Sequence, residues 1–209
     1  HGSTIVASML KNTAHICASL VLGAIVAAFA AQSSLHSASA ASRAEAINDA
    51  ERVLGFQVTM PARRLIDVRF TDAEGALVTL EDKRGTVVLI NFWATWCPPC
   101  VREMPSLERL QTELGGAGFE VLAISEDREA KVIGPFYEHF GLRQLGGYHD
   151  PYGRLSRQLK VTGLPTTILI DHRGFEVGRV VGAAEWDSRE SVALIRYYLT
   201  LPTSTASAE

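Results

Sequence analysis

The sequence predicts an α/β fold in which helices cover both faces of a central mixed β-sheet. Two observations carry this prediction. An uninterrupted apolar run at residues 86–93 is followed at once by a helical stretch at residues 98–114, and the alternation of apolar strands with helical segments then continues toward the C-terminus. The length of 209 residues, 47% apolar content and net charge of −3 fit one globular domain with an extra segment. This charge excludes the strongly basic balance typical of nucleic-acid binding.

The apolar run at residues 86–93 is rich in β-branched side chains, so it is predicted to be a strand buried on both faces. The helix at residues 98–114 starts with two prolines, whose missing N–H groups cost little at first helical positions, and stops at Gly115 and Gly116. Residues 119–124 are predicted to form the next buried strand.

The second half of the domain repeats this alternation. The acidic residues Glu126, Asp127 and Glu129 suit the first turn of a helix that ends near Gly141 and is bent or split at Gly134–Pro135. Asp150 and Pro151 begin another helix that reaches Lys160. The remaining predicted elements are a hairpin and a final helix, at residues 166–170, 176–181 and 187–199.

The region before the core is predicted to be a tether followed by an N-terminal β-hairpin extension. The hairpin strands are expected at residues 65–70 and 77–80, around a turn at Glu74–Gly75. An amphipathic stretch at residues 43–54 predicts one short helix in the tether. The expected organisation is an upstream remnant at 1–8, a signal peptide or membrane anchor at 9–31, a linker with a short helix at 32–60, the folded domain at 61–201 and a disordered tail at 202–209.

Residues 16–31 are all apolar or small, and no formal charge occurs between Lys11 and Arg43. This pattern is typical of a signal-peptide core or of one short anchor helix. Lys11 before the apolar run predicts that the N-terminus stays in the cytoplasm and that the domain is exported. Small-residue cleavage sites at residues 28–30 and 38–40 leave both removal and retention of the segment open.

The pair Cys97 and Cys100 carries the predicted chemistry. Three positions apart at the start of a helix, the two thiols lie on one face and can close a small disulfide ring. The positive end of the helix lowers the pKa of the Cys97 thiol, which makes Cys97 the expected nucleophile and Cys100 the more buried resolving thiol. Cys17 is left over and is expected to be an inert small hydrophobe in the apolar segment.

Metal binding is the main alternative use of two cysteines at this spacing. Tetrahedral zinc needs two further ligands, and the candidates are scattered without paired spacing at His139, His149 and His172. No metal site and no cofactor are therefore predicted. Pro98 and Pro99 cannot donate an N–H to the Cys97 sulfur, which predicts a reducing couple, nearer ~−270 mV than ~−120 mV.

Three motifs occur in order in the core: Asn-Phe-Trp-Ala-Thr-Trp-Cys-Pro-Pro-Cys at residues 91–100, Glu-Met-Pro at 103–105 and Gly-Leu-Pro-Thr-Thr at 163–167. Over roughly residues 62–200 the chain resembles thioredoxin-like thiol-disulfide oxidoreductases of the TlpA, ResA and CcmG (DsbE) type. The resemblance implies a thioredoxin-like fold and a cis Pro165 that faces the disulfide. It also implies that a substrate strand pairs with the backbone of Leu164 beside Cys97. Trp96, next to the dithiol, is expected to shape the rim that partners touch, and Pro98 is also expected to contact substrate.

The resemblance also suggests a proton acceptor. Thioredoxins carry an aspartate at the position of Asn91, where it helps to move the proton of the resolving cysteine. The amide of Asn91 cannot exchange a proton at neutral pH, so another acid must do so. Glu103 follows Cys100 by three residues on the same helical face and matches the active-site glutamate of the ResA and CcmG type. We expect Glu103 to accept the proton of Cys100 with a pKa raised by partial burial. The alternative is a surface glutamate that pairs with Arg102 or Arg109.

The residue after Pro165 points to a subtype. CcmG-type proteins usually have an acidic residue there, whereas this chain has Thr166. The expectation is therefore an exported protein-disulfide reductase of the TlpA type on the periplasmic side of the bacterial inner membrane, anchored or released. Its expected partners are periplasmic disulfide-bearing proteins, including copper chaperones for cytochrome oxidase, and a transmembrane dithiol electron donor.

Cytochrome c maturation, with apocytochrome c as the substrate, is the nearest alternative function. A peroxidase of the peroxiredoxin kind needs a Pro-x-x-x-Thr-x-x-Cys setting, which the residues before Cys97 do not supply. A non-enzymatic copper chaperone would have a wider cysteine spacing and a nearby histidine. A plain binding module has no use for a dithiol beside a cis proline.

Overall fold

The computed structural model describes residues 41–65, 67–116 and 118–202. The chain divides into two compact units, residues 1–45 and residues 46–209. Of the first unit, residues 41–45 are described and are helical. The predicted remnant at 1–8, the apolar segment at 9–31 with Cys17 and the last seven residues lie outside the described part. Within the described ranges, no helix is long and apolar enough to cross a membrane.

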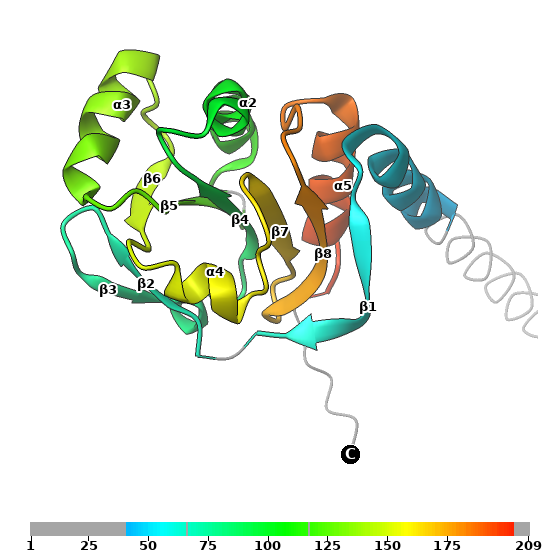
Figure 1. Cartoon of the computed structure of the whole chain (residues 1–209). Helices are drawn as coiled ribbons and strands as arrows, with labels where there is room; N and C mark the ends of the chain where they lie inside the picture. The colour runs from blue at the N-terminus through cyan, green and yellow to red at the C-terminus, as the bar shows by residue number, and fades with distance from the viewer. Residues whose placement is uncertain (1–40, 66, 117, 203–209) are drawn as a thin grey trace, which may run out of the picture. The chain divides into compact units, whose positions relative to one another are not determined.

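The second unit is built on one mixed eight-stranded sheet with strand order β1-β8-β7-β4-β5-β6-β2-β3 (Figure 1). Parallel pairing joins β4 to β5 and β5 to β6, and the other neighbours are antiparallel. The strands are β1 (Gln57–Arg64), β2 (Arg69–Asp72), β3 (Leu77–Thr79), β4 (Val87–Trp93), β5 (Phe119–Ser125), β6 (Gly146–His149), β7 (Thr166–Ile170) and β8 (Phe175–Val181). The predicted mixed central sheet is therefore confirmed.

Helices cover both faces of this sheet, as predicted. The helices are α2 (Pro98–Leu114), α3 (Ile133–Phe140), α4 (Arg154–Gln158) and α5 (Arg189–Leu199), with short 3₁₀ turns η1 (Leu80–Lys83) and η2 (Ala130–Val132). One core cluster contains buried residues of α2, α3 and α5, and a second cluster on the opposite face contains Leu155 of α4. Helical residues 46–54 contribute Ala50 and Leu54 to the first cluster.

Strand β4 is the centre of the fold because all seven of its side chains are buried. Its side chains alternate between the two clusters, with Leu89 and Trp93 in the first and Ile90 and Phe92 in the second. The prediction of a strand buried on both faces is thus confirmed, and β4 ends where α2 begins.

The N-terminal edge of the domain differs from the prediction. The hairpin β2–β3 is present, but its first strand begins at Arg69 instead of residue 65. Strand β1 was missed, and residues 57–60, assigned to the tether, belong to it. Its mixed polar sequence and Pro61 hide the strand, because an edge strand that pairs on one side tolerates both. The pairing of β1 with β8 shifts register between Val58 and Arg63.

The segment between β5 and β7 also departs from the prediction. The acidic residues Glu126, Asp127 and Glu129 precede the helix, which begins at Ile133 after η2. Pro135 consequently lies in the first turn of α3, where its missing N–H breaks no hydrogen bond within that helix. The helix ends as predicted at Gly141, which has a left-handed φ of 67°.

Strand β6 was also missed, since two of its four residues are glycines and it lacks an apolar run. Helix α4 begins at Arg154, later than predicted, and ends at Gln158. Asp150 nevertheless caps it: its carboxylate accepts the backbone N–H of Arg154 and of Leu155, both at 2.9 Å.

Candidate active site

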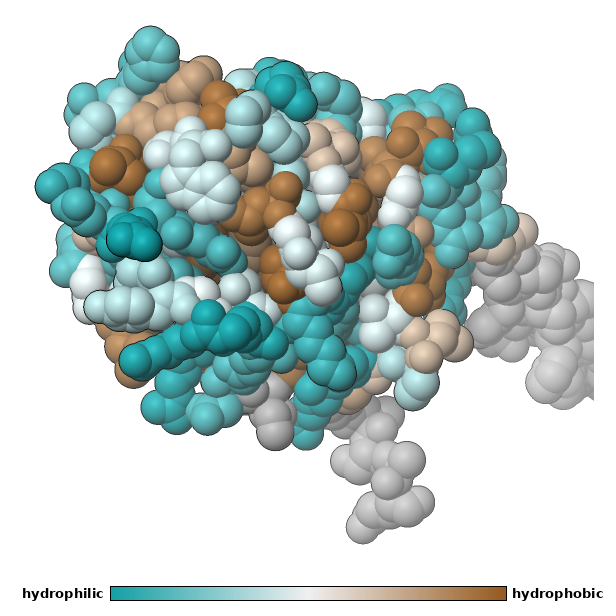
Figure 2. Space-filling view, in the orientation of Figure 1, coloured by the Kyte–Doolittle hydropathy of each residue, from teal (hydrophilic) through white to brown (hydrophobic). Residues whose placement is uncertain are grey.

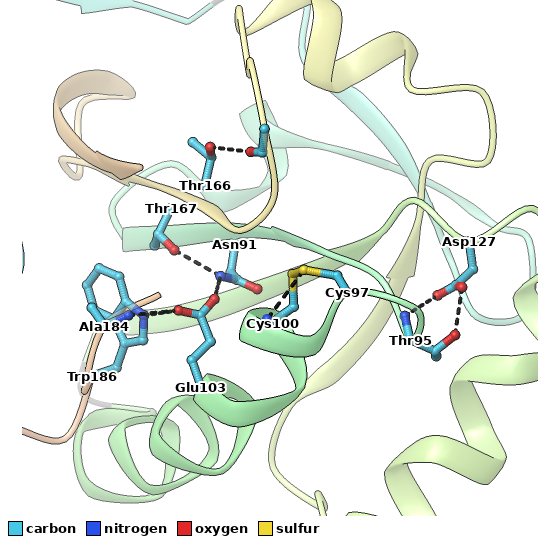
Figure 3. The surroundings of a disulfide bond; sticks show 11 residues. Asn91, Thr95, Cys97, Cys100, Glu103, Asp127, Thr166, Thr167, Ala184 and Trp186 are labelled. Atoms are coloured by element: carbon cyan, nitrogen blue, oxygen red, sulfur yellow. Dashed lines mark hydrogen bonds between the residues drawn. A yellow bond between two sulfur atoms is a disulfide. The ribbon is translucent and has the colours of Figure 1, made fainter. Parts of the chain in front are cut away.

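The two predicted cysteines are joined at the point where β4 gives way to α2 (Figure 3). Their Sγ atoms form a disulfide with a length of 2.07 Å, and their Cα atoms are 5.3 Å apart. Cys97 is the N-cap of α2, and its Sγ accepts the backbone N–H of Cys100 at 3.4 Å. Cys97 is 5% exposed and Cys100 is fully buried. An incoming sulfur therefore reaches Cys97 more readily than Cys100.

Two prolines occupy the first two positions of α2. Pro98 and Pro99 have no N–H group, so the first backbone donor of the helix is the N–H of Cys100. A helix N-terminus normally presents three or four free N–H groups to a cap or an anion. The thiolate of Cys97 consequently meets fewer donors here than at an ordinary helix start.

Glu103 lies inside the domain, one turn along α2 from Cys100. Its side chain accepts three hydrogen bonds, from Asn91 Nδ2 at 2.7 Å, the Ala184 backbone N–H at 3.1 Å and Trp186 Nε1 at 3.3 Å (Figure 3). Only 2% of Glu103 is exposed. Burial raises the pKa of this carboxyl to about 7, while the three donors lower it in part.

The alternative interpretation of Glu103 as a surface glutamate is wrong. The side chain is buried, and its hydrogen-bond partners are neutral donors rather than arginines. Arg109 is turned to a different carboxylate, that of Asp187, at 2.5 Å. A buried carboxyl with a pKa near neutrality can both take up and release a proton at physiological pH.

Asn91 is fully buried on β4 and links the two sides of the site. Its amide nitrogen donates to Glu103 Oε1 and to Thr167 Oγ1, the latter at 2.9 Å. Thr167 lies directly across the sheet from Asn91 in the pairing of β4 with β7. Among the described residues, no group donates a hydrogen bond to the Asn91 carbonyl oxygen.

Asp127 holds the turn that precedes Cys97, a role that the sequence analysis missed. Its buried carboxylate accepts the Thr95 backbone N–H at 2.9 Å, the Thr95 hydroxyl at 2.8 Å and the Ser125 hydroxyl at 2.8 Å. The acidic residue was expected in a helix. A usable signal was its place two residues after the end of β5, because parallel neighbours β4 and β5 end at the same edge of the sheet.

The loop before β7 lies at the same end of the sheet. The Leu164–Pro165 peptide bond is cis, and Thr166, the next residue, pairs with Phe92 of β4. Thr166 is buried, and its hydroxyl donates to the Gly163 carbonyl at 2.7 Å. Leu164 is half-buried.

The predicted rim residues are at the surface. Trp96 is 65% exposed and Pro98 is also exposed. Trp93, by contrast, is fully buried and packs on Phe136, with ring centroids 4.8 Å apart. In the part of the chain that the structure describes, no group of three His, Cys, Asp or Glu side chains is arranged to hold a metal ion.

Comparisons with known proteins agree with this geometry. Residues 61–175 match the model of the AhpC/TSA family. The thiol-disulfide oxidoreductase ResA of Bacillus thuringiensis is 34% identical over 112 residues, which cover 54% of this chain and 64% of that protein. ResA of Geobacillus kaustophilus is 37% identical over 115 residues, with 55% and 65% covered. The chain thus spans less than two thirds of the length of these curated relatives.

Solved structures give the same assignment over the folded unit. The structure of a thiol:disulfide interchange protein DsbE from Chlorobium tepidum matches with a TM-score of 0.60 and 30% identity, covering 66% of this chain and 96% of that one. A thiol-disulfide oxidoreductase from Bacteroides vulgatus matches with a TM-score of 0.54 and 31% identity, covering 64% and 92%. With its thioredoxin-like domain, the chain belongs to the AhpC/TSA family.

Proposed function

We propose that this protein is a thiol-disulfide oxidoreductase that reduces disulfides in other proteins. The observation that carries the proposal is the disulfide at the N-terminus of α2, with Cys97 the more accessible sulfur. The names of the ResA relatives and of the DsbE structure support the same chemistry. The two prolines after Cys97 favour the reducing direction, because fewer N–H donors stabilise its thiolate.

The proposed reaction starts from the dithiol form. The Cys97 thiolate attacks one sulfur of a substrate disulfide, and the substrate's other sulfur leaves as a thiolate and takes up a proton. Cys100 then loses its proton, and its thiolate attacks the Cys97 sulfur of the mixed disulfide. The Cys97–Cys100 bond forms, the second substrate thiolate leaves and is protonated, and two electrons have passed to the substrate.

Glu103 is the proposed acceptor of the Cys100 proton. Cys100 is fully buried, so its proton has no direct exchange with water. A carboxyl with a pKa of about 7, one helical turn away, is ionised often enough at neutral pH to take a proton and binds it firmly enough to be useful. Three fixed donors keep that carboxylate in place between turnovers.

Substrate contact is assigned to the surface around Cys97. Trp96 and Pro98 offer apolar surface beside the sulfur, and Leu164 and Pro165 form the loop that leads into β7. Figure 2 shows hydrophobic side chains gathered between α2 and β8 on the viewed face. We assign to the backbone of Leu164 the role of pairing with an extended substrate segment, which would add to the domain as a further strand.

Two physiological settings fit this chemistry. In the TlpA-type setting, residues 9–31 direct export and tether the domain, which reduces periplasmic copper-delivery proteins. Thr166 and the N-terminal charge pattern support this setting. Cytochrome c maturation of the CcmG/ResA type is favoured by the several relatives named ResA. In either setting, a transmembrane dithiol protein must supply the electrons to an exported reductase.

The direct test is insulin reduction with dithiothreitol as the electron donor. We expect the chain and its Cys17→Ser variant to reduce insulin, and Cys97→Ser to be inactive. Turnover of hydrogen peroxide without insulin reduction would contradict the proposal, as would stoichiometric copper binding by a redox-inactive chain.

The choice between the two settings follows from the partner. In Cys100→Ser the mixed disulfide with Cys97 cannot be resolved, so substrates stay attached in the native compartment. Recovery of copper proteins supports the TlpA type, and recovery of apocytochrome c supports the CcmG/ResA type. If neither is recovered under conditions in which the variant still forms mixed disulfides with insulin, both settings are contradicted.

A further inference from the structure

The side chain of Asn91 lies on the face of β4 that α2 covers. Along β4, Leu89 and Trp93 belong to the cluster that also contains Cys100 and Met104 of α2. Asn91 lies between them with the same orientation, since side chains of a strand alternate between its faces. An amide at this central position of an apolar face is costly to bury unless its polar atoms are paired.

Only one half of this amide is paired. The nitrogen donates to both Glu103 and Thr167, whereas the carbonyl oxygen has no partner among the described residues although Asn91 is fully buried. Figure 3 shows the nitrogen facing Glu103 and Thr167 and the oxygen on the side that faces the disulfide. A buried acceptor without a donor costs about 1–3 kcal/mol, so its orientation toward the cysteines calls for an explanation.

The oxidised site offers no donor there because the disulfide sulfurs carry no hydrogen. Reduction changes this. Two electrons and two protons convert the Cys97–Cys100 bond into two thiols, and a buried Cys100 thiol then has an S–H group to donate. The vacant acceptor of Asn91 is the polar atom that the close-up places on that side of the amide.

We propose that Asn91 is a positioning residue whose carbonyl oxygen accepts the S–H of Cys100 in the dithiol form while its amide nitrogen holds Glu103. The amide thereby holds both Cys100, which gives up the proton, and Glu103, which receives it. This inference rests on the proposed thiol exchange, in which Glu103 receives that proton. It also accounts for an asparagine in the middle of a buried strand where an apolar residue would pack at lower cost.

The contact can be measured without activity, by infrared spectroscopy of the S–H stretch. A Cys17→Ser, Cys97→Ser background leaves Cys100 as the single thiol of the chain. We expect its S–H band below the frequency of an alkanethiol in a solvent that accepts no hydrogen bonds, and we expect Asn91→Leu to move the band up to that frequency. The control is Thr167→Val, which removes a partner of the amide nitrogen, keeps the carbonyl oxygen and leaves the band unmoved.

A second readout follows the resolving step in the Cys17→Ser background. When Cys97 carries a thionitrobenzoate group, release of that group reports attack by Cys100. We expect Asn91→Leu to slow this release roughly five-fold, because Glu103, the proton acceptor, loses the amide hydrogen bond that holds it.

The inference is overturned if the Cys100 band lies at or above the free-thiol frequency, a result that needs no Asn91 variant. It is equally overturned if Asn91→Leu and Thr167→Val move the band alike, because both would then act through packing. Failure of the unmodified chain to reduce insulin contradicts the proposed function instead and does not alter the band.

Discussion

Glu103 is surrounded by hydrogen-bond donors, yet its pKa is raised to about 7. The cause is removal from water, which penalises the ionised form more than the three donors favour it. The nearby negative charge of Glu185 adds to the rise. At the scale of single residues, the environment of one buried carboxyl therefore decides how the site responds to pH.

This pKa makes a prediction for stability. The folded carboxyl binds its proton more tightly than the unfolded chain, in which the group titrates near 4.5. The native state therefore loses stability as the pH rises from 4.5 to about 7, by about 3 kcal/mol at most, and the penalty persists above that. Glu103→Gln cannot ionise, so the free energy of unfolding of the oxidised variant should fall less between about pH 5 and about pH 8.

Urea denaturation of the oxidised protein at both pH values measures this difference. The variant starts from a lower stability, because an amide nitrogen replaces an acceptor, but this offset does not depend on pH. Glu138→Gln is the control, since it removes a charge at an exposed position that takes no part in the pKa of Glu103. Parallel stability curves for the parent and Glu103→Gln would contradict the raised pKa.

Elements differ in how well the sequence predicted them, and the difference has a physical cause. Strand β4 and helix α2 were predicted almost to the residue because an apolar run and paired prolines and glycines mark their ends. Strands β1 and β6 were missed because neither contains an apolar run and their pairing depends on distant partners. The same holds in the site: Cys97 and Cys100 are local signals, whereas Asp127 acts across a gap in the sequence.

Helix α2 makes a prediction through its first turn. A side chain at the N-cap position, here that of Cys97, accepts hydrogen bonds from the N–H groups of the second and third helical residues. Pro99 occupies the second of these positions. Pro99→Ala restores that donor toward the Cys97 sulfur and should stabilise the reduced thiolate. We expect the reduction potential to rise by about 20 mV, the equivalent of a hydrogen bond of about 1 kcal/mol.

Equilibration of the Cys97–Cys100 pair with glutathione gives the potential. Pro98→Ala is the matched control, because the N–H that it restores lies at the first helical position, one residue before the donors that a cap engages. An equal rise in both variants would show that proline removal itself, rather than the donor, changes the couple.

At the scale of the whole folded unit, different elements extend the sheet at its two sides. The hairpin β2–β3 continues the sheet beyond β6, while β1 continues it beyond β8. On the β1 side a buried carboxylate, Glu176, ties the strands together: it pairs with Arg63 of β1 and Arg179 of β8, each at 2.6 Å. The Arg63 guanidinium also reaches the Leu159 carbonyl at 3.5 Å, so one cluster joins β1, β8 and the end of α4.

This cluster predicts that β1 is an integral part of the domain and not an appended segment. Glu176 is 1% exposed. Loss of Arg63 leaves this buried carboxylate with only one of its two arginine partners, Arg179. Arg63→Ala should therefore lower the free energy of unfolding by about 1 to 2 kcal/mol, less than for a fully buried pair because Arg63 is partly exposed and Arg179 remains. Arg64→Ala, at the exposed next position of the same strand, should change it by less than about 0.5 kcal/mol. Equal effects of the two substitutions in urea denaturation would mean that β1 adds no specific contact, and the domain would then begin at the hairpin.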